Sequence, residues 1–247
     1  MLMRLRSLIV FAVPLVLLGV LAGLMWQPAD PLPEMKTHTA LGKGEWIPMD
    51  LGKAEAVDRI PGWDVRRGSY RLREMEGRKV LELLPEPIVE GKVLWTREMR
   101  GRGGVRARMR GDKSRRAYAR FSVGLHQDRE LHLRAFPGER KLKLVACNAD
   151  LTNEVILAEM PLPGWHWKPE DWLWLELQIV PQGGGISICE GRLWTQGSLR
   201  PEEAQLQYRL TLPQTVFFAA LQGAPYALRP ILIDAAETLS EGGRSSQ

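Results

Sequence analysis

Four tryptophans between residues 165 and 174 make this segment the strongest candidate binding site of the 247-residue sequence. Two of them alternate with Glu176 and Gln178, so all four side chains would share one face of a β-strand. Aromatic rings can stack on sugar faces, and carboxylate and amide groups can hydrogen-bond sugar hydroxyls. The alternative is that Trp172 and Trp174 pack under a loop or between sheets, because tryptophan is usually largely buried. The predicted ligand-binding residues are Trp165, Trp167, Trp172, Trp174, Glu176 and Gln178.

A stripe of arginines is a second candidate site, suited to an anion. Arginine occupies every second position of 105–110, so its side chains would share one face of a strand. Guanidinium groups suit phosphate or carboxylate, so an acidic polysaccharide, anionic lipid heads or an acidic protein would fit. The alternative is a solvated face of the hairpin that a turn at 111–114 would form, with arginines paired to nearby glutamates. The predicted stripe consists of Arg106, Arg108, Arg110, Arg115 and Arg116.

No catalytic residue, metal site or cofactor is predicted. A retaining glycosidase needs two carboxyl groups about 5–5.5 Å apart, whereas Asp171 and Glu176 would point to opposite faces of a strand. His126 and His132 could face each other across a tight hairpin, but without a clear carboxylate partner they make a poor metal site. The sequence also lacks a phosphate loop, a dinucleotide fingerprint and a serine-hydrolase elbow.

Charge and cysteine content narrow the function classes further. The net charge of +5 suggests an anionic neighbour, but no nucleic-acid recognition fold is apparent. Cys147 and Cys189 belong to no Cys-x-x-Cys motif, so redox and zinc sites have no support. The two cysteines could pair in an oxidising compartment or remain as small, partly buried thiols.

Residues 8–26 form an uncharged apolar stretch that follows Arg4 and Arg6. As a helix this stretch would be about 28 Å long, close to the roughly 30 Å hydrocarbon thickness of a bilayer. Arginines on its N-terminal side favour a cytoplasmic N-terminus. We therefore predict a single-pass protein of the cell membrane whose C-terminal domain is extracytoplasmic. The alternative is a cleaved signal peptide, for which residues 20–22 offer a small-residue cleavage signal.

Alternation of apolar and polar residues with a period of two recurs along the chain and predicts β-strands. In the clearest strand, 172–179, three leucines and Ile179 share one face. Glycines 183–185 predict a turn into the next strand. About a dozen strands are typical of an all-β sandwich or jelly roll of two antiparallel sheets. Other strands are expected at 79–84, 105–110, 119–125, 131–135, 141–145, 186–194, 215–221 and 230–235.

Residues 62–72 (Gly-Trp-Asp-Val-Arg-Arg-Gly-Ser-Tyr-Arg-Leu) are followed by the apolar segment 79–83 (Lys-Val-Leu-Glu-Leu). These two segments are similar to the hairpin and strand that open concanavalin A-like (laminin-G-like) jelly-roll domains, and later segments resemble those of the family in the same order. Residues 191–201 resemble a segment that carries Trp-Pro-x-Gly in the family, although the first proline of that pattern is absent here. Residues 229–234 resemble the closing strand. The nearest similarity is to bacterial family-16-glycosidase-like or 3-keto-disaccharide-hydrolase-like domains.

That resemblance implies glycan binding or hydrolysis on a concave sheet. The family-16 enzyme signature, Glu-x-Asp-x-x-Glu on one strand, is absent from this sequence. We therefore predict a non-catalytic module that binds a glycan or a protein at the membrane surface, with an accessory subunit of a membrane complex as a variant. The alternative is a carbohydrate-active hydrolase that uses an acid pair including Glu176. The predicted organisation is a membrane anchor or signal peptide at 1–26, a proline-rich linker at 27–44, a β-sandwich at 45–238 and a disordered tail at 239–247.

Overall fold

The computed structural model describes residues 44–86, 90–126, 129–148, 153–211 and 216–240. The chain divides into two units, Met1–Leu41 and Gly42–Gln247, of which the first lies outside the described residues. The predicted membrane anchor and nearly all of the predicted linker therefore also lie outside them. Within the ranges given above, no helix is both long and apolar enough to cross a membrane.

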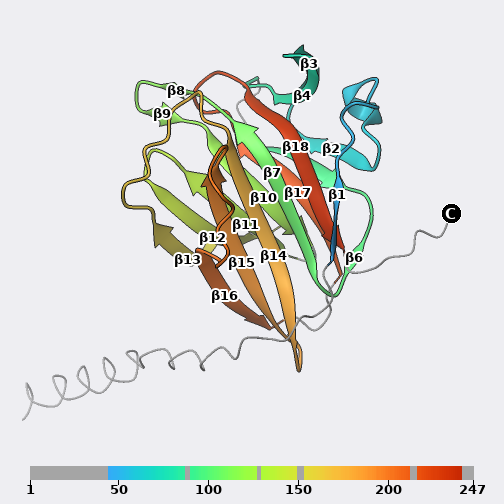
Figure 1. Cartoon of the computed structure of the whole chain (residues 1–247), viewed down its shortest axis with the longest axis vertical. Coiled ribbons are helices and arrows are strands. Elements are labelled where there is room, and N and C mark those ends of the chain that lie inside the picture. The colour runs from blue at the N-terminus through green and yellow to red at the C-terminus, as the bar shows by residue number, and fades with distance from the viewer. Residues whose placement is uncertain (1–43, 87–89, 127–128, 149–152, 212–215, 241–247) are drawn as a thin grey trace, which may run out of the picture. The chain divides into compact units, whose positions relative to one another are not determined.

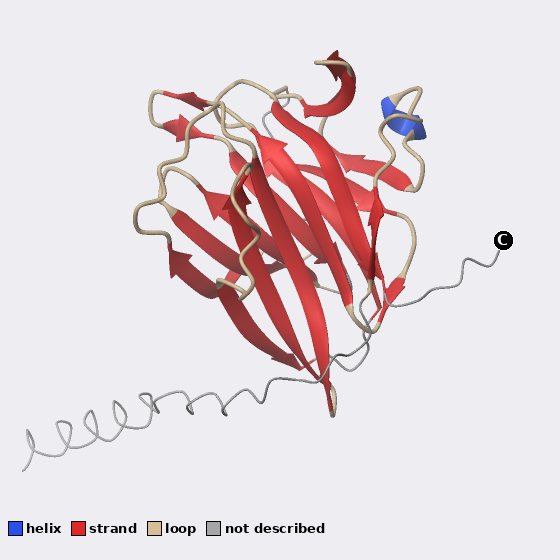
Figure 2. Cartoon of the chain, viewed as in Figure 1, coloured by secondary structure: helices blue, strands red, loops and turns tan. Residues whose placement is uncertain are grey.

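Two antiparallel β-sheets form the second unit, and its described helical content is the short 3-10 helix η1 (Val57–Arg59) (Figure 2). Sheet A consists, in spatial order, of β16 (Leu206–Thr211), β15 (Ile186–Thr195), β14 (Leu173–Gly183), β7 (Gly103–Arg110), β18 (Ile231–Ser240), β4 (Arg78–Leu83) and β3 (Tyr70–Met75), and β1 (Glu45–Pro48) also pairs with β18. Sheet B consists of β13 (Val155–Pro161), β12 (Lys141–Cys147), β11 (Glu130–Phe136), β10 (Arg120–His126), β17 (Val216–Ala224), β5 (Gly91–Trp95) and β2 (Trp63–Arg67), and β6 (Met99–Arg100) also pairs with β17. A small hairpin of β8 (Lys113–Ser114) and β9 (Ala117–Tyr118) stands apart from both sheets (Figure 1). The prediction of an all-β sandwich is confirmed.

The hydrophobic core lies between the two sheets, where the predicted alternation places apolar side chains. The apolar face of β14, which includes Leu175 and Leu177, is fully buried. It faces β10, whose Phe121 and Val123 are equally shielded from water. Each such side chain contributes about 1.5–3 kcal/mol by leaving water. The core is closely packed, since a Cβ atom on Gly191 of β15 would fall 2.5 Å from the Cδ1 atom of Leu133 in the opposite sheet.

The arginine-bearing strand β7 does not form a hairpin with the next long strand. It pairs with β14 and β18 in sheet A, whereas β10 belongs to sheet B (Figure 1). The segment expected to be a turn instead leads into β8, and the β8–β9 hairpin carries the chain from one sheet to the other. The expectation of a hairpin was wrong because alternation identifies the two faces of a strand but not its pairing partner.

The C-terminal strand β18 runs through Ser240, two residues beyond the predicted end of the domain at 238. Leu239 is buried, lies on the same face of β18 as Glu237, and is opposite Trp46 of β1. The N-terminal and C-terminal strands of the sandwich are therefore neighbours in sheet A.

Candidate functional site

The predicted polar residues of β14 lie on the outer face of sheet A and bind one another. Glu176 has no exposed surface, and it accepts hydrogen bonds from Arg200 Nε at 2.7 Å and Arg192 Nη1 at 3.2 Å. Gln178 donates to Glu176 at 2.6 Å and accepts from Arg102 at 3.1 Å. These contacts commit both side chains to bonds with each other, with Arg192 of β15 and with two arginines of the adjoining loops.

The predicted tryptophans do not form one surface. Trp174 lies on the outer face of sheet A and stacks on Trp194, with ring centroids 5.7 Å apart and an interplanar angle of 7°. Trp172 lines a 240 Å³ pocket on that sheet. Trp167 is only 8% exposed and meets Phe121 of the core edge-on at 5.9 Å. Trp165 is half-buried against the core. The structure therefore divides the predicted set between an outer face and the interior.

The predicted arginine stripe is also divided, between strand β7 and a loop. Arg106 Nε donates to Glu237 at 3.0 Å, and Arg108 makes a two-point contact with Asp234 at 2.7 and 2.6 Å. Arg110 Nε donates to the backbone carbonyl of Pro169 at 3.3 Å. Both carboxylates belong to β18, so sheet A neutralises the charge of its own arginines. Arg115 and Arg116 are exposed residues of the loop between β8 and β9, separate from that stripe.

A buried polar cluster that the sequence analysis did not identify lies on the outer face of sheet B. Glu130 Oε1 receives His126 Nδ1 at 2.8 Å, and Oε2 receives His132 Nε2 at 3.0 Å. Lys92 of β5 donates to Oε1, and Gln222 of β17 donates to Oε2 at 3.4 Å. These five residues, Lys92, His126, Glu130, His132 and Gln222, form the Glu130 cluster.

Contacts within the Glu130 cluster indicate that sheet B is curved. Lys92 on β5 and Glu130 on β11 are three strand spacings apart, about 14 Å in a flat sheet. Their strand registers differ as well, because Lys92 lies in the row of Ser122 and Glu130 in the row of His126. Side chains so far apart meet directly because twist and bending bring this diagonal of the sheet together on its outer face. We call the outer face of sheet B its concave face.

The protonation states of this cluster follow from burial and hydrogen bonding. Burial alone would raise the pKa of Glu130, but the hydrogen bonds from His126, His132 and Lys92 outweigh it and hold the pKa well below its usual range. Burial lowers the pKa of His132, and its bond to Glu130 only partly opposes this effect. Glu130 is thus ionised and His132 neutral at pH 7. Since an ionised carboxylate only accepts hydrogen bonds, Nε2 of His132 carries the proton and Nδ1 keeps a lone pair.

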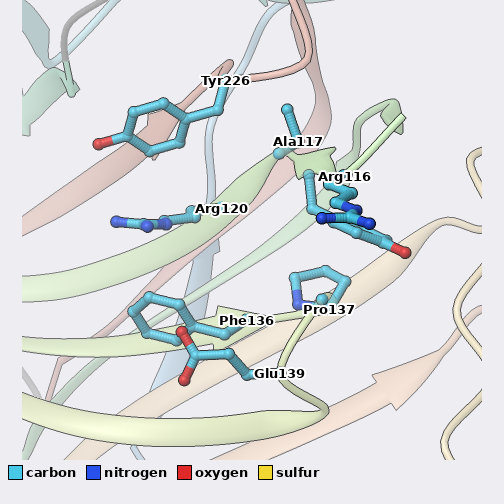
Figure 3. A pocket seen from close by; sticks show the side chains of 10 residues that line it. Arg116, Ala117, Arg120, Phe136, Pro137, Glu139 and Tyr226 are labelled. Atoms are coloured by element: carbon cyan, nitrogen blue, oxygen red, sulfur yellow. The ribbon is translucent and has the colours of Figure 1, made fainter. Parts of the chain in front are cut away.

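A pocket of about 550 Å³ lies further along the same face, and Figure 3 shows its lining side chains. Arg120 extends between two aromatic rings, with its guanidinium carbon 4.5 Å from the ring centroid of Tyr226 and 5.1 Å from that of Phe136. Arg116 lies on the other side of the cavity (Figure 3). Glu139 also lines it but is paired with Lys143 at 2.7 Å, so its charge is already balanced. We call this cavity the Arg120 pocket.

Local alternation places the pocket and the cluster on one surface. On β10, Arg120 and Ser122 share a face with His126, while Phe121 and Val123 point into the core. On β11, Glu130 and Phe136 also lie on the outer face, because their positions differ by an even number and alternate residues of a strand share a face. The sequence analysis noted His126 and His132 across a tight hairpin but missed Glu130, the carboxylate that both histidines contact. Lys92 and Gln222 lie 38 and 92 residues away from Glu130 and had no sequence signal.

The fold of the domain is a concanavalin A-like jelly roll, as the sequence resemblance led us to expect. Among solved structures, the chain is similar to the potassium-bound carbohydrate recognition domain of Emp46p, with 13% identity, a TM-score of 0.52, and coverage of 82% of this chain and 99% of that one. It is also similar to the carbohydrate recognition domain of Emp47p (9% identity, TM-score 0.51, 83% and 100% covered).

A third similar structure is the calcium-bound exoplasmic/lumenal domain of VIP36, with 10% identity, a TM-score of 0.50, and coverage of 80% of this chain and 90% of that one. No protein-family model matches the chain, and no curated protein matches it. At these levels of identity, the likeness establishes the fold.

Proposed function

We propose that this protein is a non-catalytic glycan-binding module that the segment 8–26 anchors to the membrane with the sandwich on the extracytoplasmic side. The observation that carries the proposal is the Arg120 pocket on the concave face of sheet B. Tyr226 offers a flat apolar surface for a sugar ring, and Arg120, which lies between this ring and the buried ring of Phe136, offers hydrogen-bond donors. Tyr226 is 41% exposed, so its ring is accessible to a ligand.

Charge supports an acidic or polyhydroxylated glycan at this pocket. Arg116 and Arg120 line it, and the carboxylate of Glu139 is already bound by Lys143. The guanidinium groups therefore favour a ligand that brings acceptor oxygens, such as a hydroxyl-rich or uronate-containing saccharide.

The outer face of sheet A is less suited to bind a glycan through the residues expected from the sequence. Glu176 and Gln178 already bond to each other and to nearby arginines, and Arg106 beside them is paired with Glu237. A ligand there would have to displace those bonds, which cost free energy to break. On this face Trp172 and Trp174 are still partly exposed. The predicted polar ligand-binding residues beside them, Glu176 and Gln178, are already hydrogen-bonded.

Similar structures support the proposal by analogy of fold. Two of them are titled carbohydrate recognition domains, and the third is an exoplasmic/lumenal domain. Since one fold hosts many functions, this analogy raises the expectation of glycan binding and of an extracytoplasmic location, but the residues of the pocket decide the ligand.

Glycan-array screening of the detergent-solubilised full chain, followed by calorimetry on the best ligand, tests the proposal. Tyr226→Ala and Arg120→Ala should each weaken binding at least tenfold, because they remove a stacking surface and the central donor. Arg209→Ala, which removes an exposed arginine of β16 in sheet A, is the matched control and should leave affinity unchanged. Absence of binding to any glycan by the wild-type chain would refute the proposal.

The same preparation tests the variant that the chain is an accessory subunit. Native mass analysis after mild detergent extraction should show further subunits if the predicted membrane helix packs against other helices. A lone monomer that binds glycans would rule out the accessory-subunit variant.

A carbohydrate-active hydrolase is the second candidate, and one observation favours it. Glu130 is a buried, ionised carboxylate beside a neutral histidine, an arrangement that can move protons. Against it, every recorded hydrogen-bond partner of Glu130 is a nitrogen donor, whereas the two-carboxylate mechanism needs a second carboxyl close by. An assay for released sugar decides: turnover by the wild type that Glu130→Gln or Glu176→Gln abolishes would favour the enzyme.

A further inference from the structure

Four buried polar atoms on the concave face of sheet B have no hydrogen-bond partner among the described residues. Three of them belong to one row across neighbouring strands, since Gln222 of β17 lies opposite Ser122 of β10, which lies opposite Arg134 of β11. The fourth belongs to His132, in the adjacent row opposite Gly124. We call these four residues the inner subsite, and their unpartnered atoms are Ser122 Oγ, His132 Nδ1, Arg134 Nε and Gln222 Oε1.

The unpartnered atoms include both donors and acceptors. Nδ1 of His132 holds a lone pair because Nε2 donates to Glu130, and Oε1 of Gln222 is an acceptor because its Nε2 also donates to Glu130. Arg134 Nε is a donor, and the hydroxyl of Ser122 can act in either role. A fully deprotonated inorganic anion such as sulfate could only accept hydrogen bonds, so it could not satisfy the two acceptors. Hydroxyl groups, which both donate and accept, match all four atoms.

Charges around the inner subsite are already compensated. Arg134 is paired with Glu90 at 3.0 Å and with Glu154, and Lys92 is paired with Glu130. A neutral ligand therefore fits the surroundings better than a charged one.

The outward positions of sheet B between the residues of the inner subsite carry small side chains. The outward positions between the polar residues are Gly124 on β10 and Ala220 on β17, which lie opposite each other. A Cβ atom on Gly124 would fall 2.8 Å from Nδ1 of His132, so a larger residue would crowd the acceptor. Glycine at this position lets the ring of His132 pack closely against β10.

We propose that the inner subsite binds hydroxyl groups of a neutral sugar unit, with His132 Nδ1 as a hydroxyl acceptor and Glu130 as the positioning residue that fixes its tautomer. This inference rests on the proposed function, because the sugar unit belongs to the glycan held in the Arg120 pocket. From Arg120 to Gly124 the strand advances about 13 Å. The ligand is therefore an oligosaccharide that lies along β10 and spans both places, and a monosaccharide reaches only one of them.

The competing explanation is that ordered water satisfies these atoms, as it does in many protein interiors. Water and sugar differ in a measurable way: a bound saccharide changes the environment of His132 and contributes affinity, whereas a structural water does neither. The test therefore combines a binding measurement with a spectroscopic readout at His132.

Binding of glucose, maltotriose, cellotriose and laminaritriose to the full chain is measured by calorimetry for the wild type and for Ser122→Ala. This variant removes one hydroxyl and no charge. We expect it to weaken trisaccharide binding about tenfold, and glucose, which reaches only one of the two places, should bind the wild type more weakly than a trisaccharide does. Ser187→Ala, which removes another buried serine hydroxyl on β15 of sheet A, is the matched control and should have no effect.

The tautomer of His132 is followed by ¹⁵N NMR of the histidine-labelled full chain, with the signal assigned from His132→Asn. We expect an unprotonated Nδ1 whose resonance shifts when a binding trisaccharide is added, and loss of this tautomer preference in Glu130→Gln. Trisaccharide binding that depends on Arg120 but neither responds to Ser122→Ala nor shifts His132 would overturn the inner subsite and leave the proposed function standing. If none of the three trisaccharides binds, the inner subsite is also overturned, whereas the proposed function fails only when the whole array is negative.

Discussion

Glu130 is the residue on which the concave face of sheet B depends. Its carboxylate is shielded from water, yet donors from β5, β10, β11 and β17 surround it. Burying a charge is costly unless hydrogen bonds and an opposite charge compensate for it. The cluster supplies both, which is why the carboxylate stays ionised inside the protein.

Removing this charge should destabilise the fold. Glu130→Gln leaves the buried ammonium of Lys92 without its counter-charge, and breaking a buried pair in this way typically costs about 3–5 kcal/mol of unfolding free energy. Denaturant titration of the two proteins measures the difference. Glu203→Gln, at an exposed position of the sandwich, should change the same quantity by less than about 0.5 kcal/mol. A loss at Glu130 no larger than that of the control would mean that the pair is not formed.

Both cysteines should behave as unreactive thiols. Cys147 and Cys189 are free and buried, which contradicts a disulfide between them. Burial and the nearby charge of Glu130 raise the pKa of Cys147 to about 12, and burial raises that of Cys189 as well. A thiol-reactive dye at pH 7.5 should therefore label neither in the native protein and both after denaturation. A single labelled thiol, or none, in the denatured unreduced chain would contradict this expectation.

At the scale of elements, the two sheets use similar residues for different purposes. Sheet A joins β7, β14, β15 and β18 through paired arginines and carboxylates on its outer face. Sheet B places polar residues on its concave face with hydrogen-bonding capacity to spare. This difference, which depends on the neighbouring strands, is the reason that we propose sheet B, and not sheet A, as the glycan-binding surface.

Glu176→Gln should reveal the structural role of the sheet A network. The substitution weakens the bonds from Arg192 and Arg200, and we expect a loss of about 2 kcal/mol in unfolding free energy. Affinity for glycan should remain at the wild-type level in calorimetry. A drop in glycan affinity without a drop in unfolding free energy would instead indicate that the glycan binds to sheet A, as the sequence had suggested.

Gly62 shows how closely the loop before β2 approaches sheet B. Its backbone has φ of 77°, and a Cβ atom there would fall 2.5 Å from the ring of Trp95. Gly62→Ala should therefore cost stability through both strain and overpacking. Gly77→Ala is the matched control, because Gly77 has φ of 74° but no atom within 4 Å of its added Cβ. We expect the first variant to unfold more easily by about 1–3 kcal/mol, as measured by chemical denaturation, and equal losses would exclude the clash.

For the whole molecule, the buried cluster couples folding to pH. The pKa of His132 is lowered in the folded protein from its ordinary value of 6.5. Below pH 6.5 the unfolded chain therefore binds a proton at this residue more readily than the folded protein does, and stability falls. Glu130 also has a lowered pKa, so its stabilisation is complete above 4.5 and is lost as the pH falls further. Both groups act in the same direction.

The unfolding free energy should therefore fall steadily from pH 7 to pH 4. Urea titrations at pH 7, 5.5 and 4 measure this trend, and His132→Gln should flatten the part between pH 7 and 5.5. Constant or rising stability on acidification would show that the cluster is not protected from protonation in solution.

Sequence alone determined which residues face inward, because side-chain direction in a strand is a local property with a period of two. It identified β14 and its core face, the glycine turn to β15 and the all-β class. It placed candidate ligands on sheet A because tryptophan, glutamate and arginine were visible there as local patterns. Only the tertiary structure decided which of those groups were already engaged, since the partners of Arg106 and Arg108 lie 131 and 126 residues away. It likewise brought Lys92 and Gln222 to Glu130, because strand order and sheet curvature are set by packing between distant segments, which no local pattern encodes.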